Sequence, residues 1–249
     1  MNHKFFVKSD EYEPLFKEGV VILIDKPLNW TSFAVVNKVR YRLSKIEGVK
    51  RIKVGHAGTL DPLATGLLIL CTGKYTKMID QFQGMKKRYT GTITLGSTTP
   101  SYDLETEIDH NFPTDHLSEE MIRGQAQKFV GAIQQKPPIY SAIKSGGERL
   151  YKKARRGESI EIKAREVVVD DFEIVNIEMP EVDFKLDCSK GTYVRSLAHD
   201  LGQALDTGAH LSRLRRERIG EYDVSDAWNL EELIEVLDDL LLKKGTHVS

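Results

Sequence analysis

The sequence has 249 residues, of which 40% are hydrophobic and 29% are charged, and its formal net charge is −1. This length and hydrophobic content allow a buried core and exclude the disordered and fibrous classes of protein. No apolar run reaches transmembrane length, and the N-terminus is too polar for a signal peptide. We therefore expect a cytoplasmic protein that does not interact with a membrane.

The two cysteines, Cys71 and Cys188, both lie in apolar, strand-like segments far apart in the sequence. This setting predicts buried thiols and neither a disulfide nor a metal site. The sequence has no dinucleotide-binding fingerprint, and the residues around Lys74 lack the glycine and hydroxyl positions of a phosphate loop. We expect no cofactor and no bound metal.

Residues 19–27 form an apolar run that predicts a buried strand ending at a proline. Thr31 and Ser32 then provide a helix cap, and the apolar face of the helix follows at Val35, Val36, Val39 and Leu43. A second strand, buried on both faces, is predicted for residues 67–70.

Between these strands lies Gly55–Gly66, with the sequence GHAGTLDPLATG. Glycines allow the backbone to approach a ligand closely, and Pro62 favours an extended conformation for Asp61. The stretch predicts a stiff turn that presents one carboxylate, which makes Asp61 the strongest catalytic candidate. The alternative is a purely structural Asx turn.

The middle of the chain begins with a half-buried strand at residues 86–95, in which Tyr89 points inward. A helix capped by Ser118 follows, and then a segment around residues 134–158 with a rigid Pro-Pro and a flexible Gly-Gly. Its basic, aromatic-interleaved composition suits a mobile element that orders on RNA, although a solvated amphipathic helix is an alternative. The basic residues predicted to bind RNA phosphates there are Lys144, Arg149, Lys152 and Arg155.

Strands are predicted at 165–179 and 182–188, followed by a helix whose first turn carries Arg195. A cation there opposes the helix dipole, so we expect an anionic partner unless Arg195 is a surface residue. Residues 209–216 are predicted to be a basic helical segment, and 230–241 an amphipathic helix. Basic residues at 144–165 and 213–218 provide a local positive field despite the net charge.

The pattern around Asp61 resembles that of the tRNA pseudouridine synthase B (TruB) family, G-H-x-G-x-L-D-P-x-A-x-G. Further blocks are similar to that family: Asp-Lys-Pro at 25–27, Lys-Arg-Tyr at 87–89 and Gly-Thr-Tyr-x-Arg at 191–195. The resemblance covers residues 19–220. It implies an α+β pseudouridine synthase fold, with a central mixed, mostly antiparallel sheet flanked by helices and the mobile insertion. We expect one catalytic domain over residues 1–249, without a C-terminal PUA-type domain.

The resemblance also implies an activity, the isomerisation of uridine 55 in the T loop of tRNA. Asp61 would attack the ribose C1′ or remove the C2′ proton, and the sequence leaves both open. Tyr89 would stack on the base and Arg195 would pair with Asp61. The RNA-binding residues implied are His56, Tyr193, Leu214 and Lys26. We expect a monomer that binds the T arm of tRNA without a protein partner.

The alternative from a different class is a non-catalytic RNA-binding protein or tRNA-folding chaperone on the same scaffold, which the basic segments support equally well. A zinc-dependent base deaminase is disfavoured because its His-x-Glu and Pro-Cys-x-x-Cys pattern is missing. A glycoside hydrolase would need a second carboxylate opposite Asp61, where the resemblance implies an arginine.

Overall fold

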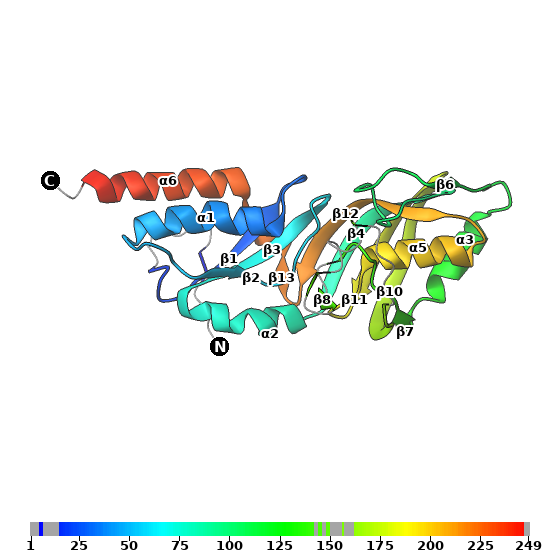
Figure 1. The fold of residues 1–249 in the computed structure, drawn as a ribbon, viewed down its shortest axis with the longest axis horizontal. Coiled ribbons are helices and arrows are strands. Elements are labelled where there is room, and N and C mark those ends of the chain that lie inside the picture. The colour runs from blue at the N-terminus through cyan, green and yellow to red at the C-terminus, as the bar shows by residue number, and fades with distance from the viewer. Residues whose placement is uncertain are drawn as a thin grey trace. The chain divides into compact units, whose positions relative to one another are not determined.

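The computed structural model describes residues 5–6, 15–141, 144–145, 148–149, 156 and 162–246. The chain divides into two compact units: the first runs to Lys87 and resumes at Arg215, and the second is Arg88–Leu214. Both combine helices with strands, which confirms the predicted α+β class (Figure 1). Across the described residues, every helix is too short or too polar to cross a lipid bilayer.

The first unit is a small mixed sheet with helices on both faces. Strand β3 pairs antiparallel with β1 and β2, and β1 pairs parallel with β14. Its elements are β1 (Val21–Lys26), α1 (Ser32–Ile46), β2 (Val54–His56), β3 (Ala64–Thr72), η1 (Gly73–Met78), α2 (Ile79–Gly84), β13 (Tyr222–Asp223), η2 (Val224–Asp226), β14 (Trp228–Asn229) and α6 (Leu230–Thr246).

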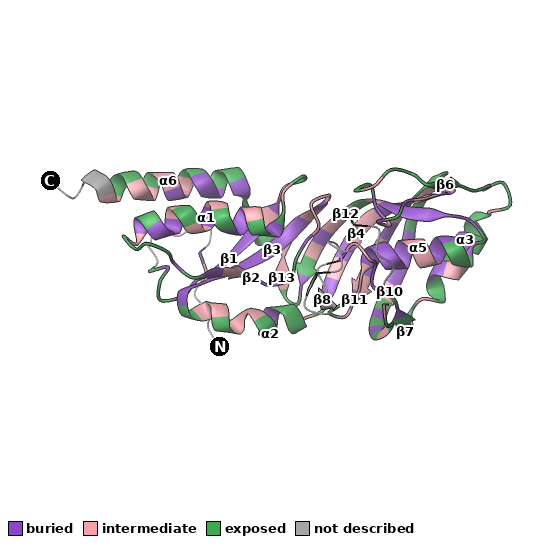
Figure 2. Cartoon of the chain, in the orientation of Figure 1, coloured by how far each residue is buried: buried purple, intermediate pink, exposed green. Residues whose placement is uncertain are grey.

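Strands β1 and β3 are buried on both faces, as their uninterrupted apolar runs predict (Figure 2). Ile22 and Ile24 pack with the apolar residues of α1 and α6, which lie side by side over one face. Val21 and Leu23 belong to the cluster on the opposite face, which includes Phe82 of α2. Successive side chains of β1 point to opposite faces of the sheet, so this one strand contributes to two separate cores.

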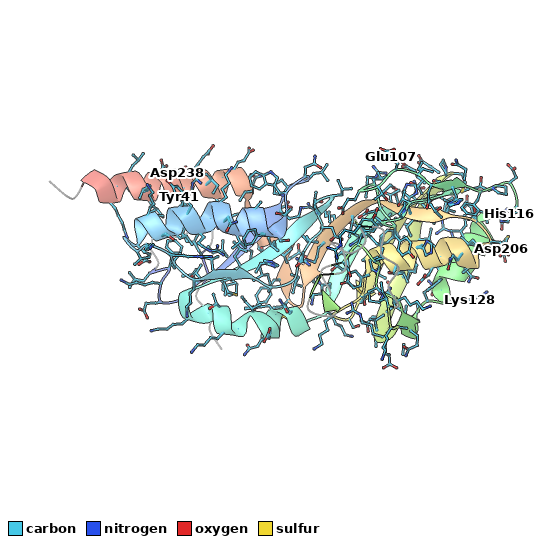
Figure 3. The ribbon with its side chains drawn as sticks, in the orientation of Figure 1. Tyr41, Glu107, His116, Lys128, Asp206 and Asp238 are labelled. Carbon is cyan, nitrogen blue, oxygen red and sulfur yellow. The ribbon has the colours of Figure 1, made fainter. Side chains whose placement is uncertain are left out.

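Helix α1 begins where the sequence predicts, because the Thr31 side chain accepts a hydrogen bond of 3.0 Å from the Ala34 amide. Helix α6 is held to it by a bidentate ion pair: Arg42 Nε and Nη2 each donate at 2.9 Å to the Asp238 carboxylate. Asp238 is marked on α6 in Figure 3. The predicted amphipathic helix at 230–241 is thus confirmed and packs on α1.

The second unit is a sheet in which β10 pairs antiparallel with both β7 and β11. Strand β4 is the next neighbour of β11. The elements are β4 (Lys87–Leu95), β5 (Ser97–Thr98), β6 (His110–Asn111), α3 (Glu119–Gln127), β7 (Gly131–Gln135), β8 (Lys144–Ser145), β9 (Glu148–Arg149), β10 (Arg165–Glu178), β11 (Glu181–Cys188) and α5 (Val194–Ala204). Much of the predicted insertion at 134–158 lies outside the described residues.

The helix predicted at 209–216 is wrong: these residues belong to strand β12 (Ala209–Ile219), which runs through the boundary between the units. Leucine and arginine favour helices, but tertiary pairing overrides that preference here. In the first unit, Gly66 of β3 packs directly against the Arg216 backbone. In the second, Ser212 Oγ donates to the Thr92 carbonyl at 3.1 Å.

Gly66→Ala tests how closely β3 and β12 pack. Gly66 has φ +103°, and a Cβ there would lie 2.3 Å from the Arg216 carbonyl oxygen. We expect a loss of about 2 kcal/mol or more in the free energy of unfolding, because the left-handed backbone and the backbone clash both penalise a side chain.

Gly124→Ala is the matched control in a denaturant unfolding experiment, since it lies in α3 with nothing within 4 Å of an added Cβ. It should be neutral or stabilising. Equal stability of the two variants would contradict the packing described here.

Candidate active site

Asp61 lies half-exposed on the turn between β2 and β3, where its carbonyl accepts a hydrogen bond of 3.1 Å from the Ala64 amide. The turn is fastened by the β1–α1 connection and by the first residue of α1. Ser32 Oγ accepts from the Leu60 amide at 2.8 Å and donates to the Leu60 carbonyl at 3.0 Å. The Asn29 amide donates to the Pro62 carbonyl at 2.9 Å. The backbone on both sides of Asp61 is therefore fixed.

Lys26 lies under this turn with no exposed surface. Its ammonium donates to the carbonyls of Pro27 at 2.9 Å, Trp30 at 2.7 Å and Pro62 at 3.4 Å, which occupies its three N–H groups. Burial lowers the pKa of Lys26 to about 8, while the nearby Asp61 carboxylate acts to raise it. Lys26 is therefore not a solvated turn residue, and its contact with RNA stays a prediction.

A second buried cation, Arg216 of β12, is 1% exposed. Its Nε donates to the Leu67 carbonyl at 2.7 Å and its Nη2 to the Gly58 carbonyl at 3.1 Å, so it bridges the two ends of the turn. His56 ends β2 beside it. Burial, with the charge of Arg216, lowers the pKa of His56, so the imidazole is neutral at pH 7. Sequence reasoning missed the role of Arg216, because a basic residue among other basic residues gives no signal of burial.

Arg195 lies in the second unit, in the first turn of α5, and is 3% exposed, so the surface alternative is wrong. Its Nη1 and Nη2 donate to the carbonyls of Ser101 at 3.0 Å and Tyr140 at 2.9 Å. Its Nε lies 3.5 Å from Asp103 Oδ2, which supplies an anionic partner of the kind the helix dipole argument requires. Pairing of Arg195 with Asp61 stays a prediction.

The loop that holds Arg195 is itself held by an aromatic stack. The ring of Tyr102 lies 3.9 Å from that of His199 on α5, with an interplanar angle of 11°. Tyr102 has φ +63°, an uncommon conformation for a residue with a side chain. Because Ser101 and Asp103 flank Tyr102, this stack helps to position both acceptor oxygens toward Arg195. Nothing in the sequence pattern had singled out His199.

The predicted pocket residues of the second unit lie on β4, on β12 and directly before α5. Tyr89 is on β4 and is 8% exposed, which confirms that it points inward. Tyr193 precedes α5, where its amide and carbonyl bond the Gln135 side chain and the Arg165 guanidinium lies 4.9 Å from its ring centroid. Leu214 is half-buried on β12.

The predicted basic surfaces are placed only in part. Lys144 and Arg149 lie on strands β8 and β9, whose backbone alone is described, and Lys152 and Arg155 lie outside the described residues. Three of the four arginines of β12 are engaged by acidic side chains, whereas Arg216 bonds backbone carbonyls. The pairs are Arg213 with Glu181, Arg215 with Asp25, and Arg218 with Asp223.

Lys26→Met tests whether the buried ammonium fastens the turn. The variant leaves the three accepting carbonyls without their donor, so we expect a loss of roughly 1–3 kcal/mol in unfolding free energy. The exposed Lys45→Met, measured by thermal unfolding beside it, should be near neutral. A Lys26→Met protein as stable as the Lys45 control would show that the ammonium does not hold the turn.

Two family models match successive parts of the chain. Residues 44–194 match the TruB family pseudouridylate synthase N-terminal domain, and residues 195–244 match the tRNA pseudouridylate synthase B C-terminal domain. A protein named tRNA pseudouridine synthase B from Flavobacterium johnsoniae is 59% identical over 213 residues, 85% of this chain and 93% of that protein. A protein of the same name from Phocaeicola vulgatus is 52% identical over 223 residues, which is 90% of this chain and 95% of that protein.

Two solved structures have a fold similar to that of this chain. A chain in the crystal structure of a Cbf5-Nop10-Gar1 complex is 30% identical, with a TM-score of 0.65 over 90% of this chain. A chain in an H/ACA RNP bound to a substrate RNA containing 2'-deoxyuridine is 26% identical, with a TM-score of 0.63 over 92%. The chain spans 56% and 61% of those two chains. The matches over both family models and nearly the full length of the relatives show that the chain belongs to the TruB family of pseudouridylate synthases.

Proposed function

We propose that this protein converts uridine 55 in the T loop of tRNA to pseudouridine, with Asp61 as the essential carboxylate. Formation of pseudouridine in tRNA is supported by two relatives named tRNA pseudouridine synthase B, at 59% and 52% identity. The position in the T loop rests on the motif resemblance. As a tRNA-modifying enzyme it would act in the cytoplasm, as a monomer formed by one catalytic domain.

The observation that carries the proposal is the fixed turn around Asp61. Catalysis by a charged group is most effective when the folded protein already holds that group in its working orientation. The backbone next to Asp61 is bonded by Ser32, Asn29 and the buried Lys26. Asp61 is half-buried, so part of the residue is open to a substrate, and the nearby Lys26 charge favours the ionised carboxylate.

The reaction breaks the bond between ribose C1′ and base N1, rotates the base and forms a bond from C1′ to C5. The C5 proton leaves and N1 gains a proton, so atoms balance without a cofactor. Asp61 would either form a transient bond to C1′ or remove the C2′ proton, and both routes need its ionised form. The target base must first leave the stack of the loop, at a cost of a few kcal/mol.

The roles proposed for the other predicted residues rest on the family resemblance. Arg195 would favour the ionised form of Asp61 through its positive charge, with its own orientation held by Ser101, Tyr140 and Asp103. Tyr89 would stack on the uracil, while Tyr193 and Leu214 would line the pocket. His56, neutral at pH 7, would contact the RNA beside the turn as an uncharged hydrogen-bonding group.

Asp61→Asn tests the proposal most simply. The amide keeps the shape of the side chain but cannot act as a nucleophile or base, so the rate should fall by a factor of roughly 10³ or more. The measurement is tritium release from a T-arm stem-loop that carries 5-tritiated uridine.

Binding of the same stem-loop is the control and should be retained in the variant. Release by the unmodified protein and none by Asp61→Asn is the expected result. If the unmodified protein binds the stem-loop but releases no tritium, the activity is refuted and a non-catalytic RNA-binding role is favoured.

A further inference from the structure

Residues 38–53 form a strongly basic segment of the first unit. The segment covers the C-terminal part of α1 and the connection to β2, and its only acidic residue is Glu47. Its basic residues are Lys38, Arg40, Arg42, Lys45, Lys50, Arg51 and Lys53. Neither a motif nor the proposed chemistry accounts for this concentration of positive charge.

Part of the charge is compensated within the protein. The Glu47 side chain is buried and is engaged by Lys17, whose amide lies 3.3 Å and whose ammonium lies 3.9 Å from its carboxylate. Arg42 is bound by Asp238 of α6. Lys38 and Lys45 each lie over an aromatic ring, those of Trp30 and the exposed Tyr41.

Four cations remain, and we call Arg40, Lys50, Arg51 and Lys53 the α1–β2 track. Lys50, Arg51 and Lys53 are exposed. Within the part of the chain that the structure describes, no carboxylate forms an ion pair with any of the four. The four side chains of the track therefore carry positive charge only.

One of these cations, Arg40, is fixed in position by hydrogen bonds. Arg40 Nη1 donates to Asn37 Oδ1 at 2.8 Å and its Nη2 donates to the Val54 carbonyl at 2.9 Å, which fixes the guanidinium at the start of β2. Burial, with the charge of Arg51, lowers the pKa of Arg40. Such mutual repulsion is relieved when a polyanion binds, and guanidinium groups suit phosphate oxygens.

The track also leads to the proposed catalytic turn within the same unit. Lys53 directly precedes β2, which ends at His56, so the two residues are roughly 10 Å apart along the strand. The start of α1 is tied to the turn by the Ser32–Leu60 hydrogen bonds. A duplex carries one phosphate per ~3.4 Å along each strand, so the distance from Lys53 to His56 corresponds to a few nucleotides.

We propose that the α1–β2 track binds phosphates of the tRNA stem next to the target loop. This inference rests on the proposed function for the identity of the RNA. Regularly spaced phosphates match a row of unpaired cations better than an acidic protein surface does, because such surfaces carry both signs of charge. The role of the track is affinity, and no residue of it takes part in the chemistry.

The test is the double variant Arg51→Gln/Lys53→Gln, which leaves Arg40 and its structural hydrogen bonds in place. Equilibrium dissociation constants for full-length tRNA are measured over a series of salt concentrations. Because the variant would neutralise two fewer phosphates, the slope of log Kd against log salt should fall by about 1.4–1.8. The kcat at saturating tRNA should be unchanged, because only binding is affected.

The matched control is Lys128→Gln/Lys185→Gln, which removes the same charge from the region of α3 and from β11 (Lys128 is labelled in Figure 3). It should keep the slope of the unmodified protein. Equal slopes for the two double variants would refute the proposal that the α1–β2 track binds tRNA phosphates. Because binding is measured without turnover, a protein that binds tRNA but forms no pseudouridine would refute the proposed function separately.

Discussion

Two buried cations hold the turn that carries Asp61, and the rest of the candidate site depends on them. Lys26 lies under the turn and Arg216 connects its two ends, each through backbone carbonyls. A buried charge is costly unless its hydrogen-bonding groups are satisfied, and carbonyl oxygens of an otherwise irregular turn satisfy them. The same contacts therefore compensate the charges and fix the loop. A carboxylate placed on that loop has little freedom to reorient.

The second unit uses the same principle for Arg195. Its guanidinium is buried and bonded by two backbone carbonyls, with Asp103 beside it. The loop that supplies these oxygens is braced by the Tyr102–His199 stack. In both units, then, an irregular loop is ordered by a buried cation rather than by an apolar core. Lys26 and Arg216 project from strands β1 and β12, and Arg195 projects from the first turn of helix α5.

Apolar runs and helix caps predicted most of the elements that support the site. The strand at 19–27, the helix cap at Thr31 and the buried strand that follows the turn are all confirmed. Local signals of this kind are read directly from neighbouring residues. The motif around Asp61 was equally local, and it predicted both the turn and the family.

What local patterns could not predict depends on partners distant in sequence. Residues 209–216 were expected to be helical, but pairing with β3 and β4 makes them a strand. The arginines there were expected to attract RNA, yet Arg215 is bound by Asp25 and Arg216 is buried. Conversely, the positive segment at 38–53 was not singled out, because its significance emerges only once the neighbouring acids are placed.

The most direct test of the central claim is to map pseudouridine at single-nucleotide resolution in an unmodified tRNA transcript incubated with the purified protein. Carbodiimide labelling followed by primer extension identifies each modified position. We expect one new pseudouridine, at position 55 in the T loop. A transcript that is bound but remains unmodified, or that is modified only elsewhere, would contradict this expectation.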